Sequence, residues 1–265
     1  MISVLILTYN EELNINKCLS SIPKYIDDIV IIDSFSDDKT RQNALKDNRV
    51  RFYKNAFEGY AEQLRYAINQ IDYKYDYIFR IDADEELIDV VSLAEKINSV
   101  ILSGPDAVYT VNRSISFLGT QLKYGGCGEV KVPRIISTKT AHVTNVPIDE
   151  HFYTLNHEVR DSQIAVLDRC NKGLDFWLSK HISYASLEAI NMRNIAAGEE
   201  TSLKRKLYYR LPGPTRPLIY FFYRYFLQFG FLDGSAGFNY LFLQAFWFRQ
   251  IVEIKHHQRK RDNND

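Results

Sequence analysis

The chain has 265 residues, of which 46% are hydrophobic and 25% are charged, and it contains only 12 Gly and 7 Pro. This composition is typical of a folded protein and excludes disordered, collagen-like and coiled-coil chains. The net charge is zero, but residues 201–265 contain 11 basic and 4 acidic residues, so this part of the chain is basic and the rest is acidic.

Apolar runs and helical patterns alternate over the first part of the chain. We predict strands at Ile2–Leu7, Ile29–Ile32, Val50–Tyr53, Tyr77–Ile81 and Ala107–Asn112, and helices at Asn14–Ser21, Ala61–Asn69 and Leu93–Leu102. Short, continuous apolar strands separated by helices are typical of a parallel sheet that is buried on both faces. The sequence therefore predicts an α/β protein with a doubly wound, mostly parallel sheet.

The cysteines and the first strand bear on the compartment. No two of Cys18, Cys127 and Cys170 form a C-x-x-C pair, so we expect neither a disulfide framework nor a structural zinc site. We therefore expect the protein to work in a reducing compartment of the cell. The segment MISVLILTYNEE has no basic residues before its apolar run. We therefore expect a strand here and not a signal peptide.

Polar clusters follow three of the predicted strands, at residues 8–12, 33–38 and 82–86. Ligands of open parallel sheets bind at the carboxyl ends of the strands, where these clusters would converge. Asp37 and Asp38 have a second interpretation, because Asp is also a common helix cap. One cap does not account for residues 82–86, where four carboxylates lie within five residues.

Asp82 and Asp84 alternate at the end of a predicted buried strand, where two carboxylates repel each other unless positive charge lies between them. A divalent cation with oxygen ligands is the usual remedy, and Mg²⁺ typically joins one or two carboxylates to the phosphates of a substrate. Since no Gly-rich phosphate loop lies nearby, this pair predicts a nucleotide diphosphate that is held through a metal ion.

The stretches V-L-I-L-T-Y-N-E-E, I-I-D-S-F-S-D-D-K-T and F-R-I-D-A-D-E resemble family 2 glycosyltransferases of the GT-A fold, and the resemblance covers essentially the whole chain. It is closest to small bacterial enzymes of lipopolysaccharide-core, capsule and exopolysaccharide assembly. The resemblance implies an inverting sugar transfer, of the hexosyltransferase type, from a nucleotide-sugar donor. A UDP-sugar is the expected donor, and Mg²⁺ or Mn²⁺ is the expected cofactor.

The resemblance also implies roles for individual residues. Thr8, Asn10 and Glu11 would line the nucleotide pocket, Asp33 would face the base or the ribose, and Asp82 and Asp84 would lie beneath the diphosphate. Phe35 stands where the family often has Gly, so this loop is expected to hold its nucleotide slightly differently.

An inverting transfer needs a group that takes the proton of the acceptor hydroxyl. The segment Ile148–Phe152 resembles the acceptor-side motif of the family, in which an acidic residue commonly supplies this base. We predict Glu150 as the catalytic base and keep Asp149 as the alternative. Two solvated acids in a loop would be the structural explanation of the same residues.

Two further residues have both a functional and a structural interpretation. Arg134, in a short strand at Pro133–Ile136, could offset the charge of the donor phosphates or anchor the strand. Several GT-A enzymes add a late histidine as a third metal ligand, and His181 has a suitable place in the chain; imidazole suits Mn²⁺ better than Mg²⁺. A lone histidine is otherwise a hydrogen-bonding group of the core.

Two apolar, aromatic stretches lie at residues 216–228 and 238–254, separated by the segment 230–234. Neither reaches the roughly 20 uninterrupted apolar residues of a membrane span. Their polar residues fall on one helical side and basic residues flank the pair, so we expect a helical hairpin on an anionic membrane surface. Core helices and a homo-oligomer interface stay open, whereas a nucleic-acid partner is not expected, because such a tail would be more basic and less aliphatic.

The predicted organisation is a catalytic domain over residues 1–200 and a membrane-associating region over residues 201–265. The segments Asn112–Lys131 and Asn156–Leu174 follow no readable pattern and are expected to be loops that set sugar choice. The resemblance implies a lipid-linked or cell-envelope glycan as acceptor, and a place on the cytoplasmic face of the bacterial cytoplasmic membrane or in the cytoplasm. Two alternatives remain: a nucleotidyltransferase, for which residues 1–20 lack the Gly-rich loop, and a non-catalytic, nucleotide-sugar-binding partner subunit.

Overall fold

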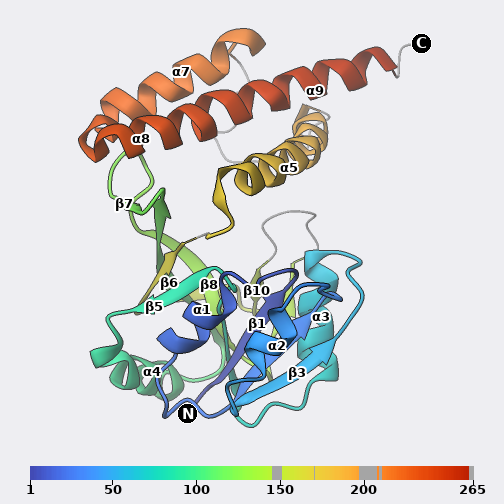
Figure 1. Ribbon diagram of the computed structural model, residues 1–265, viewed down its shortest axis with the longest axis vertical. Helices are drawn as coiled ribbons and strands as arrows, with labels where there is room; N and C mark the ends of the chain where they lie inside the picture. Colours follow the sequence, from blue (N-terminus) through green and yellow to red (C-terminus); the bar gives the residue numbers. More distant parts are fainter. Residues whose placement is uncertain (145–150, 170, 197–207, 209–210, 263–265) are drawn as a thin grey trace. The chain divides into compact units, whose positions relative to one another are not determined.

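The computed structural model describes residues 1–144, 151–169, 171–196, 208 and 211–262 (Figure 1). The chain forms two compact units: the first contains Met1–Ser116 and Glu129–Asn171, and the second contains Phe117–Gly128 and Lys172–Asp265. This division differs from the boundary that we predicted at residue 200. The long helix that begins at Gly173 packs against the last helix of the chain and therefore belongs with the C-terminal region.

The first unit is built on a mixed sheet with the strand order β3-β2-β1-β4-β8-β6-β11-β5. The pairs β3–β2, β2–β1, β1–β4 and β6–β11 are parallel, and the other pairs on this path are antiparallel. The strands are β1 (Ser3–Thr8), β2 (Ile29–Asp33), β3 (Val50–Lys54), β4 (Tyr77–Arg80), β5 (Glu85–Ile88), β6 (Ala107–Phe117), β8 (Val130–Ser137) and β11 (Glu158–Asp168), and a separate small sheet pairs β9 (His142–Val143) with β10 (Phe152–Tyr153). The predicted α/β fold class is confirmed.

Helices cover both faces of this sheet. They are α1 (Ile15–Ser21), α2 (Thr40–Ala44), α3 (Tyr60–Gln70) and α4 (Leu93–Leu102), the last preceded by the short turn η1 (Val90–Ser92). Successive side chains of β1 point to opposite faces, as in any strand. Val4 and Ile6 enter the core that contains α1 and α4, whereas Leu5 enters the core that contains Leu64 of α3. Burial on both faces explains why β1 is a continuous apolar run.

The predicted helices and strands up to residue 112 are present, but β5 and β11 were not predicted. β11 falls in the segment that we expected to be a loop. Its register with β6 shifts between Asp161 and Ala165, and Gln163 within this shift has a φ of 57°. The irregularity interrupts the alternation of apolar and polar residues from which a strand is predicted.

The second unit is mainly helical, and the expected aromatic hairpin is confirmed: α7 continues into a π-helical turn, η4 makes the bend, and α8 leads through a second π-helical turn into α9 (Figure 1). Its elements are β7 (Thr120–Leu122), α5 (Gly173–Ala196), η2 (Gly213–Thr215), α7 (Arg216–Phe222), η3 (Tyr223–Leu227), η4 (Gly230–Asp233), α8 (Gly234–Leu241), η5 (Phe242–Trp247) and α9 (Phe248–Asp262). No helix among the described residues combines the length and the apolar character that a membrane span requires.

Residues 123–126 lie against the bend of this hairpin at very short range. Arg224 Nε donates to the carbonyl oxygen of Gly125 at 2.6 Å, and Gly125 N donates to the carbonyl oxygen of Gln228 at 2.8 Å. Gly125 has a φ of 65°, and a Cβ atom there would lie 2.7 Å from Leu241 Cδ1 and 3.2 Å from Gly230 Cα. Only glycine allows this close approach of two backbones.

We expect the substitution Gly125→Ala to destabilise the second unit more than Gly119→Ala. Both glycines have positive φ, which costs a non-glycine residue about 1–2 kcal/mol, but nothing lies within 4 Å of a Cβ atom at Gly119. At Gly125 the steric overlap adds about 1–3 kcal/mol. Urea unfolding of both variants measures the difference, and equal losses would contradict the close approach.

Candidate active site

The connections between the parallel strands change direction at β1. From β1 the chain proceeds to β2 and β3 on one side, and α3 then returns it to β4 on the other side of β1. Ligands of open α/β sheets bind at the carboxyl ends of the strands beside such a switch point. The three predicted polar clusters directly follow β1, β2 and β4, so the structure brings them to this edge of the sheet.

The segments that follow β1 and β2 are tied together by hydrogen bonds between backbone and side chains. Asn10 N donates to Ser36 Oγ (2.8 Å), Glu11 N to Thr40 Oγ1 (2.6 Å), Glu12 N to Asp38 Oδ2 (3.0 Å), and Asp37 N to Asn10 Oδ1 (3.1 Å). Asp38 also accepts a hydrogen bond from Thr40 N at the start of α2, so it has a capping role as well. The two segments therefore form one ordered surface.

Asp33 lies beneath this surface and has no solvent exposure. Its carboxylate accepts hydrogen bonds from Thr8 Oγ1 (2.9 Å) and from the amide and the hydroxyl of Ser36 (2.8 and 2.5 Å). These contacts join the end of β1 to the loop after β2. Asp33 and Thr8, both predicted to contact the nucleotide, thus hold the loop from inside, while Asn10 and Glu11 are partly exposed.

Tyr9 and Phe35, which follow β1 and β2, are exposed aromatic residues at this edge, with 58% and 57% of their surface exposed. Phe35 has a φ of 61°, a conformation that glycine adopts without strain. The family that the sequence resembles often has Gly at this position, and the positive φ explains that preference. Lys54 at the end of β3 places its ammonium group 5.4 Å from the centre of the Phe35 ring. Sequence reasoning did not single out Tyr9 or Lys54.

Asp82, the second residue after the end of β4 at Arg80, is held by two arginines. Arg134 Nη1 and Nη2 lie 3.1 and 2.5 Å from the two carboxylate oxygens of Asp82, and Arg80 Nε lies 3.2 Å from one of them. Arg134 Nη2 also donates to Glu85 Oε1 at 2.9 Å, and Glu85 Oε2 accepts from Asp82 N. Arg134 therefore anchors the turn after β4, and its role toward the donor phosphates remains a prediction.

The charges of this cluster explain its protonation. Burial alone would raise the pKa of Asp82, but the neighbouring Arg134 and Arg80 hold that pKa well below its usual range. Burial raises the pKa of Glu85. Arg134 opposes this rise only in part, because Glu85 shares Arg134 with Asp82 and accepts only one of its hydrogen bonds. Burial opposes the charge of Arg134, but the two carboxylates raise its pKa further. Arg134 thus stays charged at the bottom of the site.

Asp82 and Asp84 are both partly exposed, but the carboxylate of Asp84 has no hydrogen bond or ion pair with the described part of the chain. Within the described ranges, no three His, Cys, Asp or Glu side chains could together enclose a metal ion. Mg²⁺ and similar ions need no such enclosure when they bridge one or two carboxylates to phosphates and keep several waters. The open carboxylate of Asp84 fits this mode of binding.

Arg80 and Glu85 were missed from the sequence, although one signal was present. Arg80 ends the buried strand Tyr77–Arg80, and it is only 8% exposed. A charged residue inside an apolar run requires a partner, because an unpaired buried charge is costly. The acidic cluster that follows could have been assigned to it.

The predicted bases Asp149 and Glu150 lie outside the described residues. The two ends of their segment are close together, because Thr144 N donates to the carbonyl oxygen of His151 and His151 N donates to Thr144 Oγ1. β9 and β10, which precede and follow it in the chain, pair with each other in the first unit.

His181 belongs to the second unit. Its Nδ1 lies 2.8 Å from the carbonyl oxygen of Trp177, and its ring stacks on the Trp177 ring at 3.5 Å. Since a carbonyl oxygen only accepts, Nδ1 carries the hydrogen and Nε2 keeps its lone pair. Burial lowers the pKa of His181, so the ring is neutral. Its role as a metal ligand remains a prediction.

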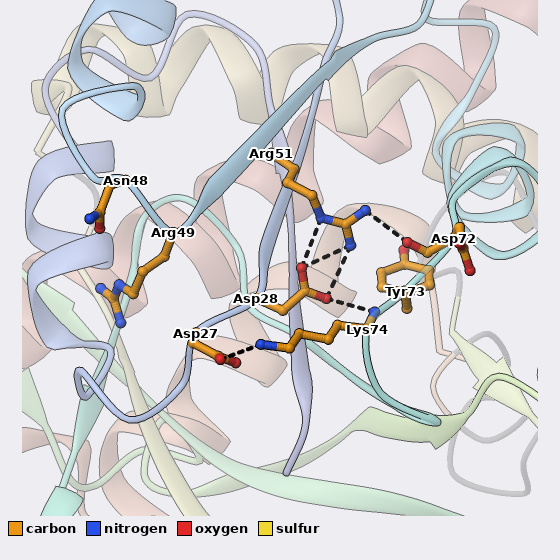
Figure 2. Close-up of a pocket in the computed structure, with 8 residues that line it drawn as sticks. All are labelled: Asp27, Asp28, Asn48, Arg49, Arg51, Asp72, Tyr73 and Lys74. Atoms are coloured by element: carbon orange, nitrogen blue, oxygen red, sulfur yellow. Dashed lines mark hydrogen bonds and ion pairs between the residues drawn. The ribbon is translucent and has the colours of Figure 1, made fainter.

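A polar pocket of about 410 Å³ lies at the opposite edge of the sheet, before β2, β3 and β4 (Figure 2). Its charges neutralise one another: Asp28 accepts hydrogen bonds from Arg51 and from Ser3, and Lys74 pairs with Asp27. These contacts tie the amino ends of the strands together. The pocket shares no residue with the switch-point edge, so we assign it a structural role.

Comparisons with known proteins indicate a family for the first part of the chain. Residues 3–125 match the model of glycosyl transferase family 2. An uncharacterized glycosyltransferase of Rickettsia typhi is 25% identical over 252 residues, which cover 89% of this chain and 80% of that protein.

Two solved structures are also similar. A mannosyltransferase from Pyrobaculum calidifontis, in complex with GDP-Man and Mn²⁺, aligns over 96% of this chain and 73% of its own, with 14% identity and a TM-score of 0.49. TarS of S. aureus aligns over 97% of this chain and 91% of its own, with 12% identity and a TM-score of 0.46. The family match spans β1 to β4 together with Asp82 and Asp84. Residues 3–125 are thus a family 2 glycosyltransferase domain, and the protein is a glycosyltransferase.

Proposed function

We propose that this protein moves a sugar from a nucleotide-sugar donor, a UDP-sugar first among the candidates, to a hydroxyl of a lipid-linked or cell-envelope glycan, with inversion at the anomeric carbon. The observation that carries the proposal is the open carboxylate of Asp84 beside the arginine-held Asp82, at the switch point of the sheet and within the family match.

The donor nucleotide would bind over the segments that follow β1 and β2. Asn10 and Glu11 are partly exposed there, and Tyr9 and Phe35 offer exposed rings against which a base can stack. Thr8 and Asp33 support this surface from below, so we assign them a positioning role.

A divalent cation, Mg²⁺ or Mn²⁺, would be held by Asp84 and the donor diphosphate, where it would offset the charge of the leaving nucleoside diphosphate. Asp82 keeps its arginine partners in this scheme and orients the turn that carries Asp84. His181, through Nε2, remains a candidate for a further ligand, a position that would favour Mn²⁺ over Mg²⁺.

The chemical step would be a single displacement. The carboxylate of Glu150, or of Asp149 as the alternative, takes the proton of the acceptor hydroxyl while its oxygen bonds to the anomeric carbon. The bond between that carbon and the phosphate oxygen breaks, and the nucleoside diphosphate leaves with the electron pair. Attack on the face opposite the leaving group inverts the configuration.

We further propose that the protein works on the cytoplasmic face of a bacterial membrane. The basic C-terminal region and its aromatic hairpin support this part of the proposal, because such helices favour an anionic interface.

The substitution Asp84→Asn should weaken binding of UDP in the presence of Mn²⁺ by at least about tenfold, a loss typical when the coordination of a bound metal is altered. Chelation of the wild type should have the same effect. Titration calorimetry measures both, and hydrolysis of a UDP-sugar should fall in parallel. The control is Asp76→Asn, an exposed carboxylate paired with Lys139. Equal affinity of wild type and Asp84→Asn would contradict the proposal.

The pair Thr8→Val and Ser3→Ala separates support of the nucleotide surface from general stability. Both hydroxyls lie on β1 and donate to a buried carboxylate, Thr8 to Asp33 and Ser3 to Asp28 at the other edge. Each loss should cost about 1–3 kcal/mol of the free energy of unfolding. Only Thr8→Val should also weaken UDP binding. If both variants bind UDP like the wild type, Thr8 has no part in the site.

The substitution Glu150→Gln should lower kcat by about 10²–10⁴-fold, the usual contribution of a general base. UDP affinity should stay unchanged, because the base acts on the acceptor. The matched variant is Asp149→Asn, one residue earlier. Steady-state kinetics decide between them: an inactive Asp149→Asn with an active Glu150→Gln would move the assignment to Asp149.

A further inference from the structure

The helix α7 and its continuation η3 present large apolar side chains to solvent. Leu218, Ile219, Phe222, Tyr223, Phe226 and Leu227 are between 45% and 71% exposed. Their spacing, two neighbours in every four residues, places them on one side of the helix. Phe229, Phe231, Leu232, Phe238 and Phe242 of the bend and the returning helix are at least 41% exposed as well. We call these eleven residues the apolar band.

The opposite side of the same helix is buried and carries a charge. Arg224 is only 6% exposed, although it lies between Phe222 and Phe226 in the sequence. Its guanidinium donates to the carbonyl oxygen of Gly125 at 2.6 Å, to Cys127 Sγ at 3.0 Å and to Gln244 Oε1. The helix buries Phe221 together with this charge and exposes the six large apolar side chains, whereas a helix packed on a protein core in water exposes its charges.

The arrangement of the band is ordered by contacts within the second unit. Phe222 stacks on Phe226 with ring centres 5.6 Å apart, and Phe238 stacks on Phe242 at 6.1 Å. Single exposed apolar residues are ordinary on protein surfaces, but a contiguous set of this size marks an interaction site. The hydrogen bonds of Arg224 keep the helix from rotating the band inward.

We infer that the apolar band docks into the interface of a lipid bilayer that contains anionic headgroups. Phenylalanine, tyrosine and leucine are the side chains that an interfacial helix buries at the boundary of headgroups and acyl chains. The region that carries the band, residues 201–265, has 11 basic and 4 acidic residues, which complements anionic lipids.

A second copy of the chain fits the band less well than a membrane. An isologous contact would bring two strongly basic regions together, and like charges at an interface oppose association. This inference deepens the membrane part of the proposed function and rests on it, but it concerns only residues of the second unit.

Flotation of the full-length protein with vesicles of phosphatidylcholine, with and without phosphatidylglycerol, tests the inference. The wild type should float with the anionic vesicles and do so less at high salt. Phe226→Glu and, independently, Leu227→Glu should each lower the bound fraction by at least about tenfold, since burying one such side chain has an effect of this size. The matched control is Leu102→Glu at the end of α4, which replaces a side chain that is 86% exposed outside the band.

Size-exclusion chromatography with light scattering and UDP binding accompany the flotation. A wild type that ignores anionic vesicles, or variants of the band that float like the wild type, would overturn the inference. So would a wild-type dimer that does not float and that Phe226→Glu converts to a monomer. UDP binding reports on the first unit. A wild type that does not bind UDP would refute the proposed donor, but it would leave the flotation result unaffected.

Discussion

The ion-pair cluster of Arg134, Asp82 and Glu85 is the interaction on which the site depends. It joins β8, which supplies the arginine, to the turn between β4 and β5. Two carboxylates within four residues of a turn would repel each other, and removing Arg134 would leave Asp82 with Arg80 alone and the buried Glu85 without its ion pair. The antiparallel pairing of β8 with β4 brings Arg134 to this turn, so the sheet topology and the electrostatics of the site depend on each other.

Because of this cluster, the two aspartates of the D-x-D sequence have different surroundings. Asp82 is occupied by arginines, and its carboxylate fixes the shape of the turn. Asp84, two residues on, has no partner in the part of the chain that is described, and it is the group that can bind something new. A pattern that reads as two equivalent ligands thus contains one structural and one open carboxylate.

Local patterns were sufficient to predict most of the first unit. The apolar runs of β1, β2 and β4 are visible because burial on both faces removes polar residues from them. β11 was missed because its bulge interrupts the pattern, and the packing of α5 on α9 could not be predicted because the two helices meet from distant parts of the sequence.

The same limit applies to the site. The polar clusters could be placed at one edge, because parallel strands bring their carboxyl ends together. The pairing of Arg134 with Asp82 could not be predicted, since it depends on the position of β8 in the sheet. In the second unit, the sequence predicted a polar side and an apolar side for the helix at residues 216–227. Only the structure shows that the side with Arg224 is buried.

The hydrogen bonds that tie the segments after β1 and β2 have a consequence for how this protein can hold phosphate. Gly-rich phosphate loops bind anions through free backbone amides that point at the ligand. Here the amides of Asn10, Glu11 and Glu12 already donate to side chains, and so do those of Ser36 and Asp37. A diphosphate over these amides meets donors that are already in use, so its charge has to be balanced by cations rather than by the peptide backbone.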